Sequence, residues 1–411
     1  MSTTTNVELS DLMVSRGGTV DPSRYLDEEF ELYSIPAFDS GRPEIVKGEQ
    51  IGSTKQLVKP GDVLLSRIVP HIRRSWVVQS QSTRRLIASN EWIVFRSERV
   101  DPNYLRQMLL SDLFYAQFMN TVAGVGGSLL RARPSFVSRI SIPLPARSEQ
   151  RRIAEVLDRV DALREMRRKA IALLDDLAQS VFLDMFDPPD HDWPRVTVAD
   201  LVAADANSIR TGPFGSQLLH EEFVESGIPV LGIDNAVANE FRWAKPRFIT
   251  EEKYRKLRRY TVRPGDVLIT IMGTCGRCAV VPEDITTAIN TKHLCCITLD
   301  QKRCAPKFLH SYFLRHPDSL SYLRRTSKGA IMAGLNMGII KSLPVALPPI
   351  SLQKEYSVRL NVIESSRRDL VSHLAELDAL FASLQSRAFR GELWHDEAKE
   401  LAGEEAYGQW E

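Results

Sequence analysis

The chain has 411 residues, a formal net charge of +1 and 43% hydrophobic residues, as expected of a globular protein with two to three domains and a large core. No apolar run approaches the roughly 18 to 20 residues of a membrane span, and the first residues lack the basic and apolar segments of a secretory signal. These features argue against secreted and membrane-spanning classes and predict a cytoplasmic protein.

The net charge hides an uneven distribution. Residues 188–350 hold 21 Lys and Arg against 16 Asp and Glu, a net charge of +5, whereas residues 391–411 hold one Lys against seven acids, a net charge of −6. A basic globule with an acidic tail is compatible with a polyanionic ligand. By itself this signal is weak, because many domains that bind no polyanion are equally basic.

The first 146 residues predict a mixed α/β globule. Residues 58–68 place a Pro-Gly turn before a β-rich run, residues 89–97 resemble a strand, and residues 103–119 have an amphipathic helical pattern. A Gly-rich loop at 123–134 follows, without the spacing of a phosphate-binding or dinucleotide-binding loop.

The loop after the first strand, PHIRRSW at residues 70–76, has two interpretations of equal weight. Basic residues beside an aromatic residue on a loop could contact phosphates and bases. The same pattern also describes a solvated loop with a half-buried Trp.

Residues 147–187 predict a long helix with apolar residues at alternating three- and four-residue spacing, which is the seam of a coiled coil. Ser148 is the expected helix N-cap, and Arg167 is an exception within the seam. The predicted seam positions are Ile153, Val160, Leu163, Leu174, Leu177 and Val181.

A Pro-rich stretch at 187–195 marks the end of this helix. Its DPPD sequence is superficially similar to the D-P-P-Y motif of adenine-N6 methyltransferases, but Asp190 stands where the aromatic residue belongs. We interpret the stretch as a linker.

Residues 188–349 repeat the first globule in outline. The P-G-D-V-L motif at 60–64 returns at 264–268, a strand pattern returns at 289–300, and a helix pattern returns at 305–315. All five cysteines lie here, and a zinc site can be drawn from Cys275, Cys278 and Cys295 with His293. The flanking sequences are apolar and strand-like, so we favour buried reduced thiols, at Cys296 and Cys304 as well.

A second seam pattern occupies residues 350–392, with Ser351 as the expected N-cap and Arg367 within the seam. Its predicted positions are Leu360, Ile363, Leu370, Leu374, Leu377 and Leu384. The segments 142–153 and 345–356 align at a shift of 203 residues, so the whole chain predicts an internal repeat.

Each helix of roughly 37 residues would be roughly 55 Å long and would expose its stripe if it stood alone. We therefore expect the two helices to pair as an antiparallel coiled coil, so that one chain imitates a two-fold dimer. The alternative is two ordinary core helices of one domain. The predicted division is a globule at 1–146, a helix at 147–187, a globule at 188–349, a helix at 350–392 and an acidic tail at 393–411.

This arrangement resembles the specificity (S) subunit of type I restriction-modification systems. The resemblance rests on GPFGSQL at 212–218, both P-G-D-V-L motifs, LPARSEQRRIAEVL at 144–157 with its counterpart from 347, and AFRGEL at 388–393. It covers roughly residues 1–395. The N-terminal globule has no clear copy of GPFGSQL, so the opening of the first copy cannot be placed.

The resemblance implies two mixed α/β target recognition domains joined by spacer helices, and no catalytic site in this chain. It implies double-stranded DNA, two modification subunits and a translocating restriction subunit as partners. No cofactor is expected in this chain; S-adenosylmethionine is expected in the modification subunit, and ATP and Mg in the restriction subunit. The subunit would act as a ruler that reads a bipartite site, with at most about 16 base pairs between half-sites at 3.4 Å each.

From charge and loop position we predict that DNA contacts come from the loops after the P-G-D-V-L strands and from the Gly-rich loops. The predicted residues are Ser66, Arg67, Arg73, Arg74, Arg131, Thr274, Arg277, Lys292, His293 and Lys328.

Three other functions compete with this interpretation. One is the recognition subunit of a DNA methyltransferase complex without restriction. Another is a self-contained methyltransferase or nuclease, for which no cofactor motif or metal cluster is convincing. The third is a coiled-coil interaction protein that never touches DNA.

Overall fold

The structure is a computed structural model that describes residues 5–15, 17–79, 83–124, 130–187, 192–205, 207–326 and 335–393. The chain forms two compact units. The first comprises Met1–Arg168 with Ser372–Glu411, and the second comprises Lys169–Val371.

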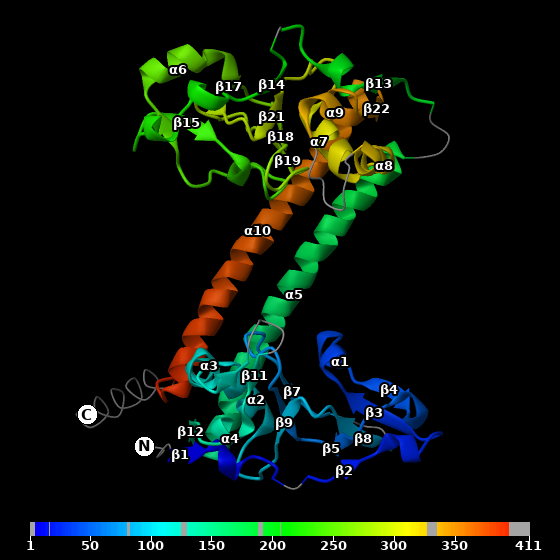
Figure 1. The fold of residues 1–411 in the computed structure, drawn as a ribbon, viewed down its shortest axis with the longest axis vertical. Coiled ribbons are helices and arrows are strands. Elements are labelled where there is room, and N and C mark those ends of the chain that lie inside the picture. Colours follow the sequence, from blue (N-terminus) through cyan, green and yellow to red (C-terminus); the bar gives the residue numbers. More distant parts are fainter. Residues whose placement is uncertain are drawn as a thin grey trace, which may run out of the picture. The chain divides into compact units, whose positions relative to one another are not determined.

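The described residues of the first unit form short helices and mostly antiparallel sheets, besides parts of two long helices (Figure 1). In chain order they are β1 (Thr5–Glu8), β2 (Thr19–Val20), β3 (Glu29–Tyr33), α1 (Ile35–Asp39), β4 (Glu44–Lys47), β5 (Lys55–Leu57), β6 (Val63–Ser66), β7 (Ser75–Val77), β8 (Arg85–Ala88), β9 (Trp92–Phe95), α2 (Pro102–Leu110), α3 (Asp112–Met119), β10 (Val122–Ala123), β11 (Arg131–Ala132), α4 (Pro134–Val137) and β12 (Ser141–Leu144). The main sheets have the orders β2-β5-β8-β3-β4, β7-β6-β9 and β1-β12, and a small hairpin joins β10 to β11.

The second unit repeats much of this arrangement with its own elements. They are β13 (Arg195–Thr197), β14 (Ile209–Thr211), β15 (Ile228–Leu231), β16 (Phe248–Ile249), α6 (Glu251–Leu257), β17 (Thr261–Val262), β18 (Val267–Thr270), β19 (Cys278–Val280), β20 (Ala288–Asn290), β21 (Leu294–Ile297), α7 (Pro306–Arg315), α8 (Pro317–Thr326), α9 (Met337–Lys341) and β22 (Pro344–Ala346). The sheet orders are β16-β15-β20-β17, β14-β21-β18-β19 and β13-β22.

The strand pairings show that the repeat is structural. Among the described residues of the first unit one strand pair is parallel, β3 with β8, and its counterpart is the parallel pair β15 with β20. The antiparallel group β7-β6-β9 matches β19-β18-β21, and β1 with β12 matches β13 with β22. Each unit is therefore a mixed α/β domain with the same central strand pairings, to which the first adds β2 and the β10-β11 pair and the second adds β14.

The P-G-D-V-L motifs form the same turn in both units. Gly61 and Gly265 adopt φ values of 89° and 76°, which favour glycine. The buried carboxylate that follows accepts a hydrogen bond from a backbone amide three residues earlier, Lys59 N to Asp62 Oδ2 at 2.8 Å and Arg263 N to Asp266 Oδ2 at 2.9 Å. The motif thus ends one strand and begins the next in a fixed geometry.

The described residues of the second unit form one strand more in the sheet around β18 than those of the first unit form in the sheet around β6. β14 precedes the GPFGSQL segment and pairs with β21, whereas the corresponding edge of β9 carries only an isolated bridge between Met13 and Phe95. The absence of a second GPFGSQL copy in the sequence therefore coincides with the absence of this strand among the described residues of the first unit.

The pattern at 103–119 forms two helices and not the single predicted one. Ser111 leaves the helical conformation, with φ −72° and ψ 156°, and its hydroxyl oxygen accepts a hydrogen bond from Phe114 N at 3.2 Å. A serine that caps the next helix outcompetes continuation of the first.

Two 40-residue helices complete the units, α5 (Arg147–Phe186) and α10 (Ile350–Phe389). Ser148 and Ser351 lie inside the first turn, so the prediction that they are N-caps is wrong. The N-cap positions are Ala146 and Pro349, two residues earlier, because their carbonyls accept the first helical hydrogen bonds, from Gln150 N and Gln353 N.

Within each unit, α5 and α10 lie side by side and run antiparallel (Figure 1). In the first unit the start of α5 and the end of α10 share a core that includes Leu157 and Phe389. In the second unit the end of α5 and the start of α10 share a core that includes Phe182 and Tyr356.

Burial along α5 corrects the predicted seam. Leu163 and Leu177 are 44% and 45% exposed, so they do not belong to it. The residues turned inward are, at four- and three-residue spacing, Ile153, Leu157, Val160, Arg164, Arg167, Ile171, Leu174, Ala178, Val181 and Met185. Because α5 has adjacent apolar residues at several turns, its pattern fits two seams that differ by one residue at alternate positions.

The predicted seam of α10 agrees with the burial. Leu360 is buried, Ile363 and Leu384 pack against the cores, and Leu370, Leu374 and Leu377 are half-buried. Shifting these positions back by 203 residues yields the corrected seam of α5.

One arginine of each seam pairs with an aspartate of the other helix. Arg164 Nε lies 2.6 Å from Asp378 Oδ1, and Arg367 Nε lies 2.8 Å from Asp175 Oδ1. These two ion pairs are equivalent under the shift of 203 residues. The counterpart of Arg367 is therefore Arg164 and not Arg167.

Four of the five cysteines are buried thiols, and Cys275 is half-buried. Cys278 and Cys295 lie opposite Ile269 on the two strands that flank β18, and burial raises the pKa of both thiols, that of Cys295 to about 12. No three His, Cys, Asp or Glu side chains in the described ranges are grouped to hold a metal ion. Likewise, no helix within those ranges has the length and apolar character for a bilayer crossing.

Candidate nucleic-acid interface

In each unit several strand ends converge on one short turn, and we call this region the strand-end edge. In the second unit the turn is residues 291–293, between β20 and β21. Its backbone bonds join it to three other elements, Thr291 N to Leu231 O at 2.9 Å, Gly212 N to Thr291 O at 3.3 Å and Ile271 N to His293 O at 2.9 Å. The loops that follow β14, β15 and β18 therefore meet here.

The first unit has the same edge around residues 89–91. Ser89 N bonds to Tyr33 O at 3.1 Å, and Arg67 N bonds to Glu91 O at 3.0 Å. The connection from β6 to β7, residues 67–74, leaves from this edge, as the connection from β18 to β19, residues 271–277, does in the second unit.

Nine of the ten predicted DNA-contact residues lie at or beside these edges, and Lys328 lies outside the described residues. In the first unit, however, the guanidinium groups already have intramolecular partners. Arg67 and Arg131 share the carboxylate of Glu91, at 3.1 and 3.2 Å, and thereby lower the pKa of that carboxyl group.

Arg73 and Arg74 are held as well. Arg74 makes a bidentate pair with Asp39 at 2.8 and 3.0 Å, and only 9% of the residue is exposed. Arg73 lies 2.7 Å from Asp112 and 4.0 Å above the ring of Tyr115. The last predicted residue of this unit, Ser66, is buried and donates its hydroxyl proton to Ile68 O. Sequence reasoning missed these partners because they come from distant parts of the chain.

The second unit leaves its edge more positive. Lys292 and His293 occupy the turn where the first unit has Asn90 and Glu91, so the carboxylate that binds two arginines is replaced by an imidazole. Partial burial, then Lys292 and Arg247, lower the pKa of His293. Thr274 and Arg277 are exposed on the β18–β19 connection.

The loop that contains GPFGSQL also reaches this edge. A Cβ atom on Gly212 would lie 2.0 Å from Asn290 O, so only glycine allows the approach. Phe214, two residues on, is 50% exposed. The motif thus places an aromatic side chain beside the basic turn.

A model of the type I restriction modification DNA specificity domain matches residues 1–174 and 192–374. The chain belongs to this family. Each match contains one set of the repeated strands, so each unit carries one specificity domain.

Relatives at low identity agree with this assignment. The chain is 28% identical over 295 residues to the type I restriction enzyme EcoBI specificity subunit of Escherichia coli, covering 63% of this chain and 60% of that protein. It is 24% identical over 335 residues to the StySPI specificity subunit of Salmonella potsdam, covering 74% and 68%. The alignment to the EcoBI subunit thus spans less than two thirds of that relative.

A solved structure shares the fold. The S subunit of a type I restriction-modification system from M. genitalium superposes with a TM-score of 0.56 at 12% identity, covering 94% of this chain and 96% of that one.

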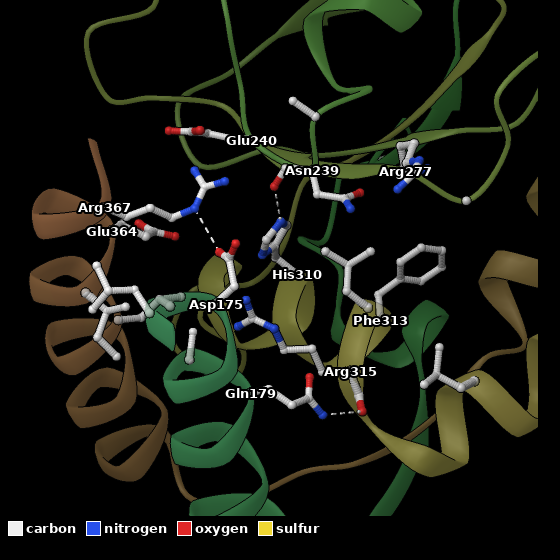
Figure 2. A pocket seen from close by; sticks show the side chains of 18 of the residues that line it. Asp175, Gln179, Asn239, Glu240, Arg277, His310, Phe313, Arg315, Glu364 and Arg367 are labelled. Carbon is white, nitrogen blue, oxygen red and sulfur yellow. Dashed lines mark hydrogen bonds and ion pairs between the residues drawn. The ribbon is translucent and has the colours of Figure 1, made fainter. Parts of the chain in front are cut away.

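Beside its strand-end edge, the second specificity domain has a cavity of about 520 Å³ that is lined by α5, α7, α10 and the loops at 238–240 and 276–277 (Figure 2). His310 lies on its wall, and its Nε2 donates to Asn239 O at 2.9 Å and Cys278 O at 3.1 Å. Burial lowers the pKa of this histidine. The imidazole thus ties the long loop after β15 to the β18–β19 hairpin.

Several charged side chains in and beside this cavity form ion pairs within the chain. Arg367 pairs with Asp175, and Lys307 pairs with Glu364. Arg277 has no ion-pair partner among the residues that the structure describes, and Figure 2 shows it across the cavity from Asp175 of α5 and Arg367 of α10. Of the predicted contacts, Arg277 is therefore the arginine whose guanidinium group remains available to an external phosphate.

Proposed function

We propose that this chain is the non-catalytic DNA sequence-specificity subunit of a type I restriction-modification complex. Family membership over two successive specificity domains carries the proposal, because a protein with two copies of one recognition fold can read two half-sites. The similar curated proteins are specificity subunits of type I restriction enzymes.

Each specificity domain would read bases in the major groove with its strand-end edge, where the loops of three or four strands meet. Donor and acceptor patterns in that groove distinguish all four base pairs, while basic residues hold the phosphates. In the second domain Lys292 and Arg277 supply the positive charge, and His293, whose pKa is lowered, supplies a neutral imidazole for hydrogen bonding. In the first domain the arginines already form ion pairs within the chain, so the shape of the edge and its neutral side chains would contribute more to DNA recognition.

The helices α5 and α10 would act as the spacer between the half-sites. The proposed division keeps recognition domains at 1–146 and 188–349, spacer helices at 147–187 and 350–392 that pair as an antiparallel coiled coil, and a tail at 393–411. The corrected seam and the two equivalent ion pairs support a fixed helix register. A fixed register would set the number of base pairs between the half-sites. It would also give the subunit an approximate internal two-fold symmetry.

The modification subunits would bind the outer helix faces. On α5 an apolar stripe remains exposed, with Met166 and Leu173 at 57% and 66% beside Leu163 and Leu177. An exposed apolar stripe on a helix favours packing by another helix. Two such partners would bring S-adenosylmethionine to the DNA, and a restriction subunit would bring ATP and Mg.

The decisive experiment is a genome-wide map of N6-methyladenine in the source strain and in a strain that lacks only this gene. Loss of one bipartite motif, restored by the gene on a plasmid, would support the proposal and identify both half-sites. A second strain with a deleted restriction subunit gene serves as the control, because modification should persist there. An unchanged map in a strain that expresses all subunits would contradict the proposal.

A further inference from the structure

The connection from β6 to β7 is held at both ends by its own arginines. At its start Arg67 pairs with Glu91, and at its end Arg74 forms the bidentate pair with Asp39. Arg73 binds Asp112 and the carbonyl of Leu110, the latter at 3.1 Å. Three guanidinium groups that hydrogen-bond within the chain cannot give the same hydrogen bonds to DNA, so they position the loop.

Between these anchoring arginines the loop exposes His71 and the apolar side chain of Ile72. Ile72 is 45% exposed, although an isoleucine gains free energy from burial. Earlier in the loop, Val69 adopts φ 49°, a left-handed conformation that is strained for a β-branched residue. Val69 N bonds to Leu130 O at 3.1 Å and Ile72 N to Val69 O at 2.9 Å, which keeps the strained turn in place.

The equivalent connection in the second unit, residues 271–277, is also held at its ends, but by the hydroxyl group of a threonine and not by arginines. Thr270 Oγ1 donates to Thr274 O at 2.5 Å and accepts from Arg277 N at 2.9 Å, which ties the two ends of the turn together. Gly273 and Gly276 adopt φ values of 68° and 78°. Met272, the second residue of this connection, is 42% exposed.

We propose that Ile72 and Met272 are specificity-determining residues that contact the 5-methyl group of thymine in their half-sites. The proposal rests on the proposed function and names the side chains that act at each strand-end edge. Both are large, exposed apolar side chains on the connection between equivalent strands of the two recognition domains, although at different positions along it. In both domains hydrogen bonds or ion pairs within the chain hold this connection in place.

Thymine is the matching ligand for such side chains. In the major groove it alone among the four bases presents a methyl group, and apolar side chains are the groups that recognise it. A half-site that contains the adenine to be methylated also contains the thymine paired with it. Every half-site therefore offers at least one methyl group to the loop.

The test is a double-substitution cycle with the complete complex of specificity and modification subunits. Duplexes carry the mapped site with each thymine replaced in turn by deoxyuridine, which removes only the methyl group. We expect one thymine in each half-site at which the replacement weakens binding by the wild-type complex about fourfold. Ile72→Ala should lower affinity to a similar extent and abolish sensitivity in the first domain's half-site, and Met272→Ala should do the same in the other.

Ile45→Ala is the matched control, because Ile45 is 49% exposed on β4, outside the β6–β7 connection. It should leave both affinity and deoxyuridine sensitivity unchanged. Thermal unfolding of each variant shows whether the fold is kept.

Two results would overturn the inference. One is a wild-type complex that binds its site but ignores every deoxyuridine replacement. The other is an Ile72→Ala or Met272→Ala complex that keeps the wild-type sensitivity. Failure of the proposed function looks different, because the wild-type complex would then show no preference for any bipartite site.

Discussion

Gln150 and Gln353 make the same three hydrogen bonds in the two units. Oε1 of each accepts a backbone amide, from Asp101 at 2.7 Å and Ala305 at 2.8 Å. Nε2 of each donates to two carbonyls, Arg99 and Pro145 for Gln150, Arg303 and Pro348 for Gln353. Each glutamine thus joins the first turn of a long helix to the start of α2 or α7.

Replacing either glutamine by alanine should lower the free energy of unfolding by about 3 kcal/mol. Both side chains are at most 1% exposed, so the substitution leaves three backbone groups buried without partners. Urea unfolding of the purified chain measures the effect. Gln179→Ala is the control, since its single bond to Arg315 O is 3.4 Å long, and it should cost about 0.5 kcal/mol. Equal losses for all three variants would contradict a special role for Gln150 and Gln353.

The ion pairs between the helices should be weakly but measurably coupled. Arg367 and Asp175 are 31% and 54% exposed, so a double-mutant cycle with alanine should give about 0.5 kcal/mol. The equivalent pair should couple more strongly, because Arg164 is only 18% exposed and lies 4.3 Å above the ring of Phe381. Thermal unfolding at low and high salt provides the readout. Zero coupling in both cycles would show that the pairs do not help to set the register.

Alanine substitutions at Leu157 and Leu163 should have different effects, the first on the stability of the chain and the second on its binding to the modification subunit. Leu157 is fully buried, and Leu157→Ala should cost 2 kcal/mol or more, about the usual value for a core leucine. Leu163→Ala should change the stability of the isolated chain by less than about 0.5 kcal/mol. It should instead reduce co-purification with the modification subunit, measured by pull-down from a co-expressing strain. The opposite pattern would restore Leu163 to the seam.

Stability should fall as the solution becomes mildly acidic, in part because of His310. Its pKa in the folded chain lies below the usual value of 6.5, through burial first and Arg315 as well, while Glu364 and two carbonyls oppose the shift. At pH 7.5 the histidine is neutral in both states, so it contributes nothing. Below pH 6.5 the unfolded chain binds a proton that the folded chain resists, which favours unfolding by at most about 1.4 kcal/mol at pH 5.5.

His310→Gln should therefore show a smaller loss of stability between pH 7.5 and 5.5 than the wild type, although its stability at pH 7.5 is lower. Chemical unfolding at both pH values gives the difference. His293 and His316 also have lowered pKa values, so part of the loss should remain. An identical pH dependence in both proteins would contradict this account.

Local patterns predicted the elements and their duplication. The Pro-Gly turns before β6 and β18 and the seam of α10 are readable because turn chemistry and helical period act between neighbouring residues. The seam of α5 was wrong by one residue at Leu163 and Leu177. The repeat itself contained the correction, since Arg367 and Phe381 of α10 fall on Arg164 and Ala178 after a shift of 203 residues.

The sequence by itself determined the order of the elements, their repetition and the family, because these depend on short-range patterns that recur along the chain. Only the tertiary structure decided which basic residues remain available for DNA. Arg74 is held by Asp39, 35 residues away, and Arg67 by Glu91, 24 residues away. Such partners meet only when strands and helices pack, so a basic loop that suggested a phosphate contact is instead an anchored support for an exposed apolar side chain.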